Sequence, residues 1–271
     1  SGWQGPGRAV AKRNREYFRR GAEAALAAGA DAINISGAGA EGDERENLLW
    51  ALEAAEPAGL PPVIDTPDAE VLEAALARCL ELSGAHTPPE RDDGEIPWAT
   101  INSITGEREC LRRALPLAKE YRTGIIALTM DDTGVPHDAH ARTAAGSALV
   151  ERLLEDGVPT RRIFLDPLVM PVAVDPENGR HALEAVRKLR ALFPDIHITC
   201  GLSNISHGLP LRTGLNRAFL SMLIEAGLDS AIMDTEDRLL LSTAIAAQAL
   251  SGKDPFCAEY IAAFRRNRLH V

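Results

Sequence analysis

Short apolar runs rich in β-branched residues alternate along this chain with longer segments in which apolar residues recur every three to four positions. The short runs predict strands at residues 31–36, 62–65, 98–102, 124–129, 163–166, 197–201 and 230–234. The longer segments predict amphipathic helices at residues 44–55, 68–82, 107–121, 139–155, 179–192 and 216–226. Strand and helix in strict alternation indicate a parallel sheet, and hence an α/β fold.

A further helical segment, residues 8–28, precedes the first predicted strand. A (β/α)8 TIM-type barrel has eight strands, each followed by a helix, so this segment should follow a strand that lies before residue 1. We expect a TIM-type barrel whose first strand is missing from this chain, or an incomplete barrel, with residues 1–7 as a loop. Residues 1–271 then form one barrel domain, and the polar insertion at 86–96 is a loop at its amino-terminal face.

Composition narrows the possible partners. The formal net charge of −10 and a pI near 5.2 argue against general attraction to nucleic acid or anionic membranes. No apolar run approaches the ~20 residues of a membrane span, and residues 1–20 lack the hydrophobic core of a signal peptide. The cysteines are scattered without a CxxC pair: Cys79, Cys110, Cys200 and Cys257. We predict a cytoplasmic protein without a metal site or disulfide framework.

Four polar residues stand where predicted strands end: Asp65, Asn102, Asp166 and Asn204. A strand–helix barrel keeps its active site at the carboxyl ends of its strands, so these side chains should meet at one mouth. Carboxylates accept hydrogen bonds, whereas an amide both donates and accepts. The set therefore suits a small, flat heterocycle rich in N–H donors.

Each of the four also has a purely structural interpretation. Asp65 could begin the next helix, although Thr66 and Asp68 already supply its cap. Asn102 could cap a helix as well, Asp166 could form a turn before a proline, and Asn204 could hold a tight turn. Individually these alternatives are as credible as a functional role. Jointly they are less so, because all four residues fall at the same edge of the predicted barrel.

A dinucleotide-binding fingerprint is also present. Gly37, Gly39 and Gly42 spell GxGxxG between a predicted strand and helix, and Asp65 lies near the position of a ribose-binding carboxylate. Three acidic residues within positions 41–44, however, crowd the helix start where a pyrophosphate would bind, and like charge there opposes binding. A glycine-rich loop over a barrel mouth is the favoured interpretation.

Several ordered motifs resemble one known family: Ile101-Asn102-Ser103, Leu128-Thr129-Met130, Leu165-Asp166-Pro167-Leu168, Gly201-Leu202-Ser203-Asn204-Ile205-Ser206 and Asn216-Arg217-Ala218-Phe219-Leu220. The chain resembles the pterin-binding methyltransferases from about residue 8 to 264. The branch it most resembles is methyltetrahydrofolate:corrinoid-protein methyltransferase, a relative of the folate domain of methionine synthase and of dihydropteroate synthase. The resemblance implies transfer of a methyl group, in either direction, between N5 of methyltetrahydrofolate and the cobalt of a corrinoid (cobalamin) carried by a partner protein.

The resemblance also assigns roles residue by residue. It implies that Asp65, Asn102 and Asp166 bind the pterin edge and that Asn204 is a mobile amide that reaches N5 of the folate. Further positions around the ligand are Gly201, Ser203, His207, Arg212 and Ile232, with His207 standing where a close relative has glutamine and Arg212 near the folate tail. Asn34 and Ser36 depart from the aspartate and asparagine usual in the family.

The implied chemistry needs help at N5, because the folate nitrogen is a poor leaving group and must be protonated or strongly hydrogen-bonded. No histidine or carboxylate is obviously placed as a dedicated acid, so an amide such as Asn204 is expected to act through preorganised electrostatics.

Two alternative functions stay open. Dihydropteroate synthase shares the barrel, but its usual serine–arginine–lysine and arginine–x–histidine signatures are replaced here by residues 201–206 and 234–237. A folate-binding subunit without catalysis is the other alternative. The resemblance further implies a homodimer, for which four residues could supply apolar helix surface: Met222, Leu223, Phe256 and Phe264.

Overall fold

The structure, a computed structural model of the protein, describes residues 4–84, 87–88 and 96–270. The chain divides into two compact units, Ser1–Ile126 and Ala127–Val271. Most of the polar insertion expected as a loop at residues 86–96 lies outside the described residues. The expectation of a single domain stays a prediction.

Strands of the sheet follow one another in chain order, β1-β2-β3-β4-β5-β6. Their bounds are β1 (Ile33–Ser36), β2 (Pro62–Asp65), β3 (Thr100–Thr105), β4 (Gly124–Leu128), β5 (Ile163–Asp166) and β6 (His197–Ile198). β1 pairs in parallel with β2, β2 with β3, and β5 with β6. Parallel strands, each followed by helix, confirm the predicted α/β class of TIM-type barrels.

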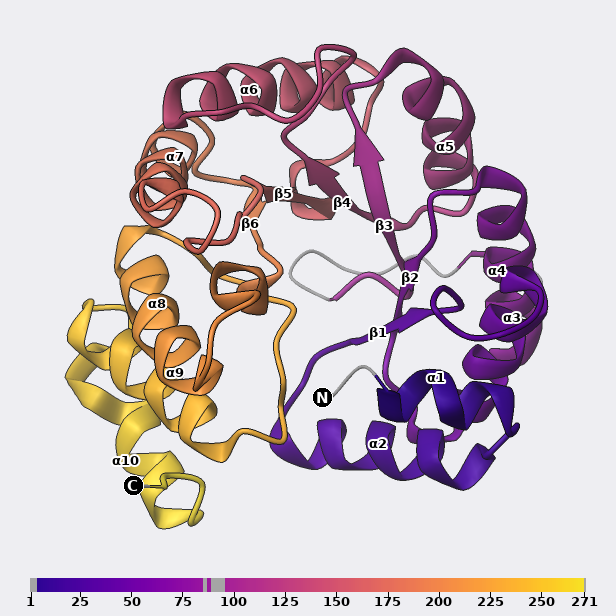
Figure 1. Cartoon of the computed structure of the whole chain (residues 1–271), viewed down its shortest axis with the longest axis horizontal. Helices are drawn as coiled ribbons and strands as arrows, with labels where there is room; N and C mark the ends of the chain where they lie inside the picture. Colours follow the sequence, from indigo (N-terminus) through magenta and orange to yellow (C-terminus); the bar gives the residue numbers. More distant parts are fainter. Residues whose placement is uncertain (1–3, 85–86, 89–95, 271) are drawn as a thin grey trace. The chain divides into compact units, whose positions relative to one another are not determined.

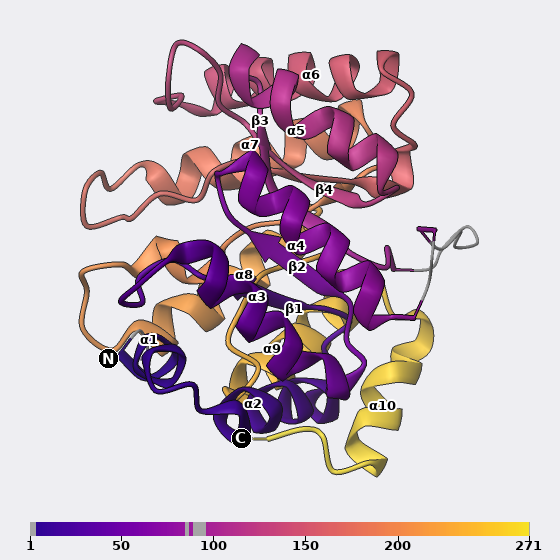
Figure 2. The ribbon, with the colours of Figure 1, turned by 90° about the vertical axis from the view of Figure 1, so that its right-hand side faces the viewer.

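The first unit contains β1 to β3 together with the helices that precede, separate and follow these strands in sequence. Its helices are α1 (Gln4–Ala11), α2 (Arg15–Ala28), α3 (Glu44–Ala55), α4 (Ala69–Leu82) and α5 (Arg108–Glu120), with a 3-10 turn η1 (Glu56–Ala58). The single helix predicted at 8–28 is two helices, because the Asn14 side chain accepts from the Tyr17 N–H and starts α2 anew. Residues 4–7, expected in a loop, are helical. α3 packs against α2 and α4 (Figures 1 and 2).

The second unit continues the alternation through β5 and β6. Its helices are α6 (Ala139–Glu155), α7 (Asn178–Leu192), α8 (Arg212–Ala226), α9 (Arg238–Leu250) and α10 (Ala258–Arg265), with 3-10 turns η2 (Thr160–Arg162), η3 (Leu202–Ser206) and η4 (Pro255–Cys257). α7 packs between α6 and α8, and α9 lies against α8 and α10 (Figure 1). The predicted helices at 139–155, 179–192 and 216–226 are confirmed, the last beginning earlier at Arg212.

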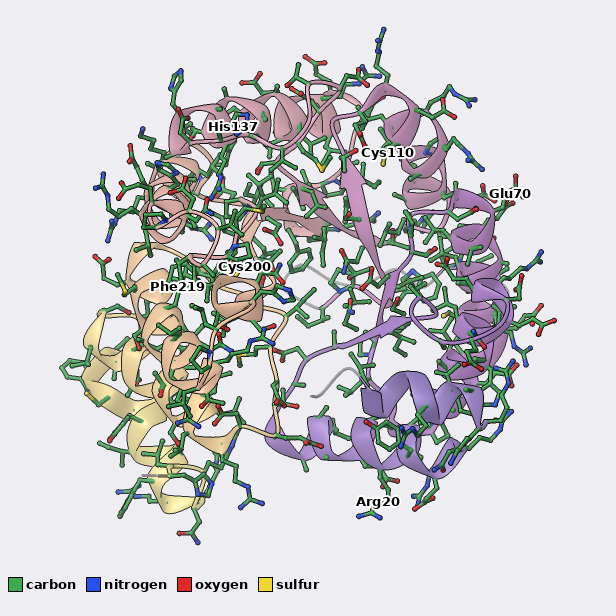
Figure 3. All side chains as sticks on the ribbon, in the orientation of Figure 1. Arg20, Glu70, Cys110, His137, Cys200 and Phe219 are labelled. Atoms are coloured by element: carbon green, nitrogen blue, oxygen red, sulfur yellow. The ribbon has the colours of Figure 1, made fainter. Side chains whose placement is uncertain are left out.

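Buried apolar side chains of both strands and helices form the core of each unit. Ile64 and Ile101 are fully buried in the first unit, as are Leu165 and Leu189 in the second. Burying each such side chain contributes roughly 1.5–3 kcal/mol of hydrophobic free energy. Figure 3 shows the difference between buried and exposed side chains: Cys200 lies in the interior, whereas Glu70 points outward from α4.

Three strand predictions need correction. β3 does not end at Asn102 but continues to Thr105, because Ile104 and Thr105 are still buried beyond the polar pair Asn102-Ser103. β6 ends at Ile198 rather than at residue 201. Within the described residues, the strand predicted at 230–234 is reduced to a single bridge between Gly201 and Ile232.

A side chain explains why no regular strand forms at 230–234 in the described chain. The carboxylate Oδ1 of Asp229 accepts the Ile198 N–H at 2.8 Å, where a regular ladder would use a main-chain carbonyl. The Asp229 and Ser230 N–H groups both donate to the Ile198 carbonyl. The run therefore starts out of register with β6 and pairs only once.

Candidate functional site

Three polar side chains form a hydrogen-bonded row in the first unit. The strand register sets Asp65 beside Ser36 on one side and Asn102 on the other. The Asn34 Nδ2 donates to Asp65 Oδ2 at 3.1 Å, and the Asn102 Nδ2 donates to Asn34 Oδ1 at 3.1 Å. The structure thus brings Asp65 and Asn102 together, with Asn34 as the bridge between them.

The Asp65 carboxylate is available for a ligand. Asp68, and not Asp65, caps α4 by accepting the N–H groups of Glu70 and Val71. Burial raises the pKa of Asp65, the hydrogen bond from Asn34 lowers it, and the charge of Glu44 raises it further. Within the described part of the chain, Asp65 forms no ion pair. A carboxylate that accepts one amide proton can accept more, because its two oxygens offer about four lone pairs.

Asp166 ends β5 and is almost completely buried, with 8% of its surface exposed. Its Oδ1 accepts the Leu168 N–H at 2.8 Å, which holds Leu168 in a left-handed conformation with φ of 61°. Burial raises the pKa of Asp166 to about 6, against the main-chain N–H groups of Leu168 and Gly201 and the charge of Arg142, which lower it. Asp166 therefore does form the turn before its loop, through a carboxylate whose pKa is raised by burial.

Asn204 lies on η3, three residues after Gly201. The turn itself is made by the main chain, because the Asn204 N–H donates to the Gly201 carbonyl at 3.2 Å and the His207 N–H donates to the Asn204 carbonyl at 3.1 Å. The side-chain amide is exposed and folds back over Gly201, where an added Cβ would lie 3.0 Å from Nδ2. The side-chain amide of Asn204 is not needed for the turn. Because Gly201 has no side chain, it leaves room for this amide.

Arg212, the first residue of α8, fixes the η3 loop. Its Nη2 donates to the Ser203 carbonyl at 2.7 Å and its Nε donates to Ser206 Oγ at 3.0 Å. The buried Ser206 hydroxyl in turn donates to Asn216 Oδ1 at 2.7 Å. This contact inside the protein was missed by the sequence analysis, and the assignment of Arg212 to a folate tail stays a prediction.

Two of the remaining predicted site residues belong to the same loop region. The Ile232 N–H donates to the Cys200 carbonyl at 2.8 Å and its carbonyl accepts the Leu202 N–H at 3.1 Å, so Ile232 supports the start of η3. His207 is exposed at the end of η3. Seven of the predicted site residues are therefore neighbours within the second unit: Asp166, Gly201, Ser203, Asn204, His207, Arg212 and Ile232.

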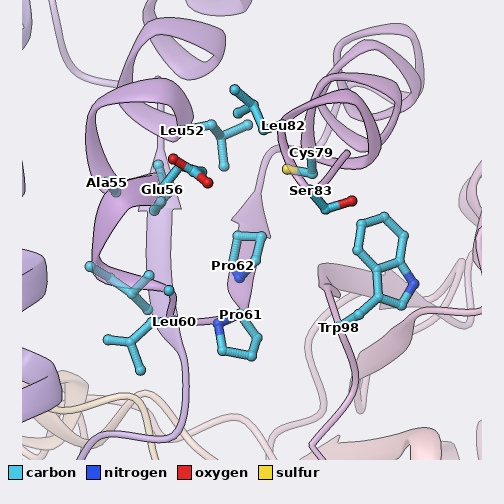
Figure 4. Close-up of a pocket in the computed structure, with 13 residues that line it drawn as sticks. Leu52, Ala55, Glu56, Leu60, Pro61, Pro62, Cys79, Leu82, Ser83 and Trp98 are labelled. Carbon is cyan, nitrogen blue, oxygen red and sulfur yellow. The ribbon is translucent and has the colours of Figure 1, made fainter. Parts of the chain in front are cut away.

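A separate cavity of about 200 Å³ lies in the first unit, between the ends of α3 and α4 and the starts of β1 and β2. Its walls are mainly apolar and include Leu52, Pro62, Cys79 and Trp98 (Figure 4). Burial raises the pKa of the Cys79 thiol to about 12, so that thiol is unreactive at neutral pH. The cavity is at the amino-terminal ends of the strands and contains none of the predicted site residues. No helix in the described part of the chain is long and apolar enough to cross a membrane.

The chain belongs to the pterin binding enzyme family, whose profile matches residues 10–234. It is 30% identical, over 97% of its own length and 92% of the relative's, to a methylcorrinoid:tetrahydrofolate methyltransferase from Eubacterium limosum. A methionine synthase from Mycobacterium tuberculosis is 34% identical over 64% of this chain, which corresponds to 14% of that longer protein. The family predicted from the sequence motifs is confirmed.

Solved structures agree on the fold. Dihydropteroate synthase from Thermus thermophilus superposes with a TM-score of 0.58 at 24% identity, covering 88% of each chain. At that identity the likeness concerns the fold alone. It supports the assignment of the strand–helix alternation to a TIM-type barrel.

Proposed function

We propose that this protein is a methyltransferase that moves a methyl group between N5 of methyltetrahydrofolate and the cobalt of a corrinoid carried by a partner protein. The observation that carries the proposal is a strand-end carboxylate in each unit, Asp65 in the first and Asp166 in the second, that forms no ion pair in the described part of the chain and accepts N–H groups from amides. Such carboxylates suit a ligand that brings its own N–H donors. The name of the Eubacterium limosum relative supports the same folate and corrinoid substrates.

In this proposal Asp65 and Asp166 accept the 2-amino and N3–H groups of the pterin, and Asn102 completes the in-plane hydrogen bonds. The Asn102 Nδ2 already donates to Asn34, which leaves its Oδ1 and its second N–H for the ligand. Asp65 keeps accepting from Asn34 while it binds the ligand. Arg212 and His207, on either side of the loop after η3, are the candidates for contacts with the rest of the folate.

Asn204 is proposed to act at N5. An amide donates or accepts without bringing a permanent charge, so it can stabilise N5 as the nitrogen loses or gains the methyl group. A hydrogen bond that strengthens as the bond to the methyl group breaks lowers the barrier more than it tightens ground-state binding. The corrinoid supplies the cobalt that accepts or gives the methyl group, and it is proposed to belong to the partner protein.

Turnover with free cobalamin tests the reaction directly. The purified protein is mixed with methyltetrahydrofolate and cob(I)alamin, and methylation of the cobalt is followed by ultraviolet-visible spectroscopy; the reverse assay uses methylcobalamin and tetrahydrofolate. We expect transfer in both assays. Folate binding without transfer in either assay, including assays with corrinoid protein, would favour the non-catalytic folate-binding subunit. Condensation of a pterin pyrophosphate with 4-aminobenzoate would favour a dihydropteroate synthase.

The variant Asn204→Ala tests the role of the amide. We expect its single-turnover rate of methyl transfer to fall well beyond any loss of folate affinity. Thr213→Ala, at an exposed position of α8 beyond the same loop, is the matched control and should leave both quantities unchanged. Equal losses in rate and affinity would show a ground-state ligand instead, and no loss in either would leave Asn204 a surface residue.

A further inference from the structure

Arg142 is a buried cation on α6 that the reaction described above does not use. Only 1% of its surface is exposed, and its Nη2 donates to Asn178 Oδ1 at 3.2 Å. Within the described residues its Nε and Nη1 are buried without a hydrogen-bond partner. Burying a charge without an ion pair is unfavourable, so a guanidinium in this place calls for a compensating role.

Three carboxylates act on the charge of Arg142. They are Asp166 at the end of β5, Asp138 at the start of α6, and Asp175 in the loop between β5 and α7. Burial lowers the pKa of Arg142, whereas these carboxylates raise it, and the guanidinium keeps its charge because arginine is not deprotonated in proteins. His181, on α7, is a further titratable group, whose charge acts on Asp138. Of the three carboxylates, Asp166 is the one that is buried.

Asn178 connects Arg142 to the two loops of the site. The Asn178 Nδ2 donates to the Pro171 carbonyl at 3.0 Å, in the loop that follows Asp166. In that loop the Val172 N–H donates to the Ile205 carbonyl at 3.0 Å, next to Asn204. The contacts Arg142–Asn178, Asn178–Pro171 and Val172–Ile205 therefore form a continuous path from α6 to η3.

We propose that Arg142 is a positioning residue for pterin binding, which supplies a buried positive charge to the Asp166 carboxylate and, through Asn178, holds the loops that carry Asp166 and Asn204. The inference rests on the proposed function, since it assigns a role toward the same ligand. Asp166 can accept two N–H groups of a pterin only as a carboxylate, because a protonated acid gives up part of its acceptor capacity. Removing the charge of Arg142 should therefore cause ligand binding to fail at a higher pH than in wild type.

The test compares Arg142→Met, which keeps the apolar bulk without the charge, with Arg142→Lys, which keeps the charge. Tetrahydrofolate affinity is measured by calorimetry from about pH 5 to about pH 9. A rise of one unit in the pKa of Asp166 should lower the affinity about tenfold at pH values below that pKa. We expect Arg142→Met to bind more weakly than wild type at acid pH, by about tenfold for each unit by which the pKa of Asp166 rises, and to recover most of its affinity at alkaline pH. Arg142→Lys should follow the wild-type profile more closely. Arg152→Met, on an exposed turn of the same helix, is the control.

Two results would overturn the proposal. One is an affinity loss in Arg142→Met that is equal at every pH, and the other is an affinity in Arg142→Met that matches wild type at every pH. A direct readout that needs no ligand separates this failure from failure of the proposed function. Carbon-13 NMR of labelled aspartate should show Asp166 titrating at a higher pH in Arg142→Met than in wild type, whether or not the protein binds folate. If Arg142→Met does not fold, Arg142→Lys and Asn178→Ala are compared instead. Asn178→Ala should then reduce the methyl-transfer rate without shifting the Asp166 titration, and an unchanged rate would refute the loop-holding part.

Discussion

The side chain of Asn34 donates a hydrogen bond to the carboxylate of Asp65 across the neighbouring strands β1 and β2, with 3.1 Å between Nδ2 and Oδ2. The family resemblance places an aspartate where this chain has Asn34. An aspartate here would set a second carboxylate against Asp65, whose pKa is already raised by burial and by Glu44. The asparagine replaces that repulsion with a hydrogen bond to Asp65, and its own Oδ1 accepts a hydrogen bond from Asn102.

Restoring the carboxylate should therefore weaken the site. We expect Asn34→Asp to lower folate affinity at neutral pH and to raise the pKa of Asp65 further, because the two carboxylates disfavour each other's ionisation. Asn34→Ala should cost on the order of 1–3 kcal/mol of binding free energy, since Asp65 and Asn102 each lose a partner. Calorimetry with tetrahydrofolate across pH measures both. If Asn34→Asp bound folate as tightly as wild type, Asn34 would not be needed to position Asp65 and Asn102 for the ligand.

Asp166 should make ligand binding depend on pH. Its pKa of about 6 means that the carboxylate gains its proton as the pH falls through about 6. We expect tetrahydrofolate affinity to decline over that range and to be lost in Asp166→Asn at every pH, because an amide offers one acceptor oxygen in place of two. The pH dependence of Kd checks this. A wild-type affinity that is constant down to about pH 5 would argue against an ionised Asp166 in the complex.

The same carboxylate should make folding stability depend on pH in the opposite sense. The folded-state pKa of Asp166 is raised from its ordinary value of 3.8 to about 6, so the folded protein binds more protons than the unfolded chain between these values. Its contribution to the unfolding free energy therefore falls as the pH rises from about 4 to about 6, by about 3 kcal/mol in total.

Asp166→Asn removes this dependence. Relative to wild type, the variant should gain stability as the pH rises over that window, whatever it loses from altered hydrogen bonds. Thermal unfolding of both proteins at several pH values measures the difference in Tm. A difference that stays constant with pH would contradict the raised pKa.

Gly201 should be needed for the position of the Asn204 amide. A Cβ at residue 201 would lie 3.0 Å from Asn204 Nδ2, so Gly201→Ala must displace that side chain. We expect a lower methyl-transfer rate with a smaller change in folate affinity. Gly214→Ala is the matched control, because a Cβ there would meet no atom within 4 Å and the residue lies in helix α8. An unchanged methyl-transfer rate in Gly201→Ala would show that the position of the Asn204 amide does not matter for the reaction.

Self-association is a further prediction. Three of the residues expected at a dimer interface are exposed, with Phe256 at 99%, Phe264 at 69% and Met222 at 51%, whereas Leu223 is fully buried and was wrongly included. We expect Phe256→Asp to weaken a homodimer in sedimentation experiments at micromolar concentration, because a charged group would replace an apolar contact. Leu192→Asp, an exposed leucine of α7, is the control. A wild-type protein that sediments only as a monomer would refute the prediction.

Periodicity identified most helices and the parallel class of the sheet because buried residues recur at fixed intervals, as in the helix Ala139–Glu155. It failed where side chains replaced main-chain partners, as Asp229 does at Ile198. It also could not show that Asn34 bridges Asp65 and Asn102, since that contact joins residues far apart in sequence. Buried Arg142 carried no signal at all, because a lone arginine in an amphipathic helix resembles any surface cation.

The contacts of Arg212 with Ser203 and Ser206 set the timescale on which Asn204 can move. Because the η3 backbone is held from α8, approach to a ligand requires rotation of the Asn204 side chain rather than rearrangement of the loop. Exposed side chains change rotamer in picoseconds to nanoseconds, whereas loops that open and close take microseconds or longer. Under the proposed function, the amide should therefore follow the chemistry at N5 without delay, and the slow step would be the encounter with the proposed corrinoid protein.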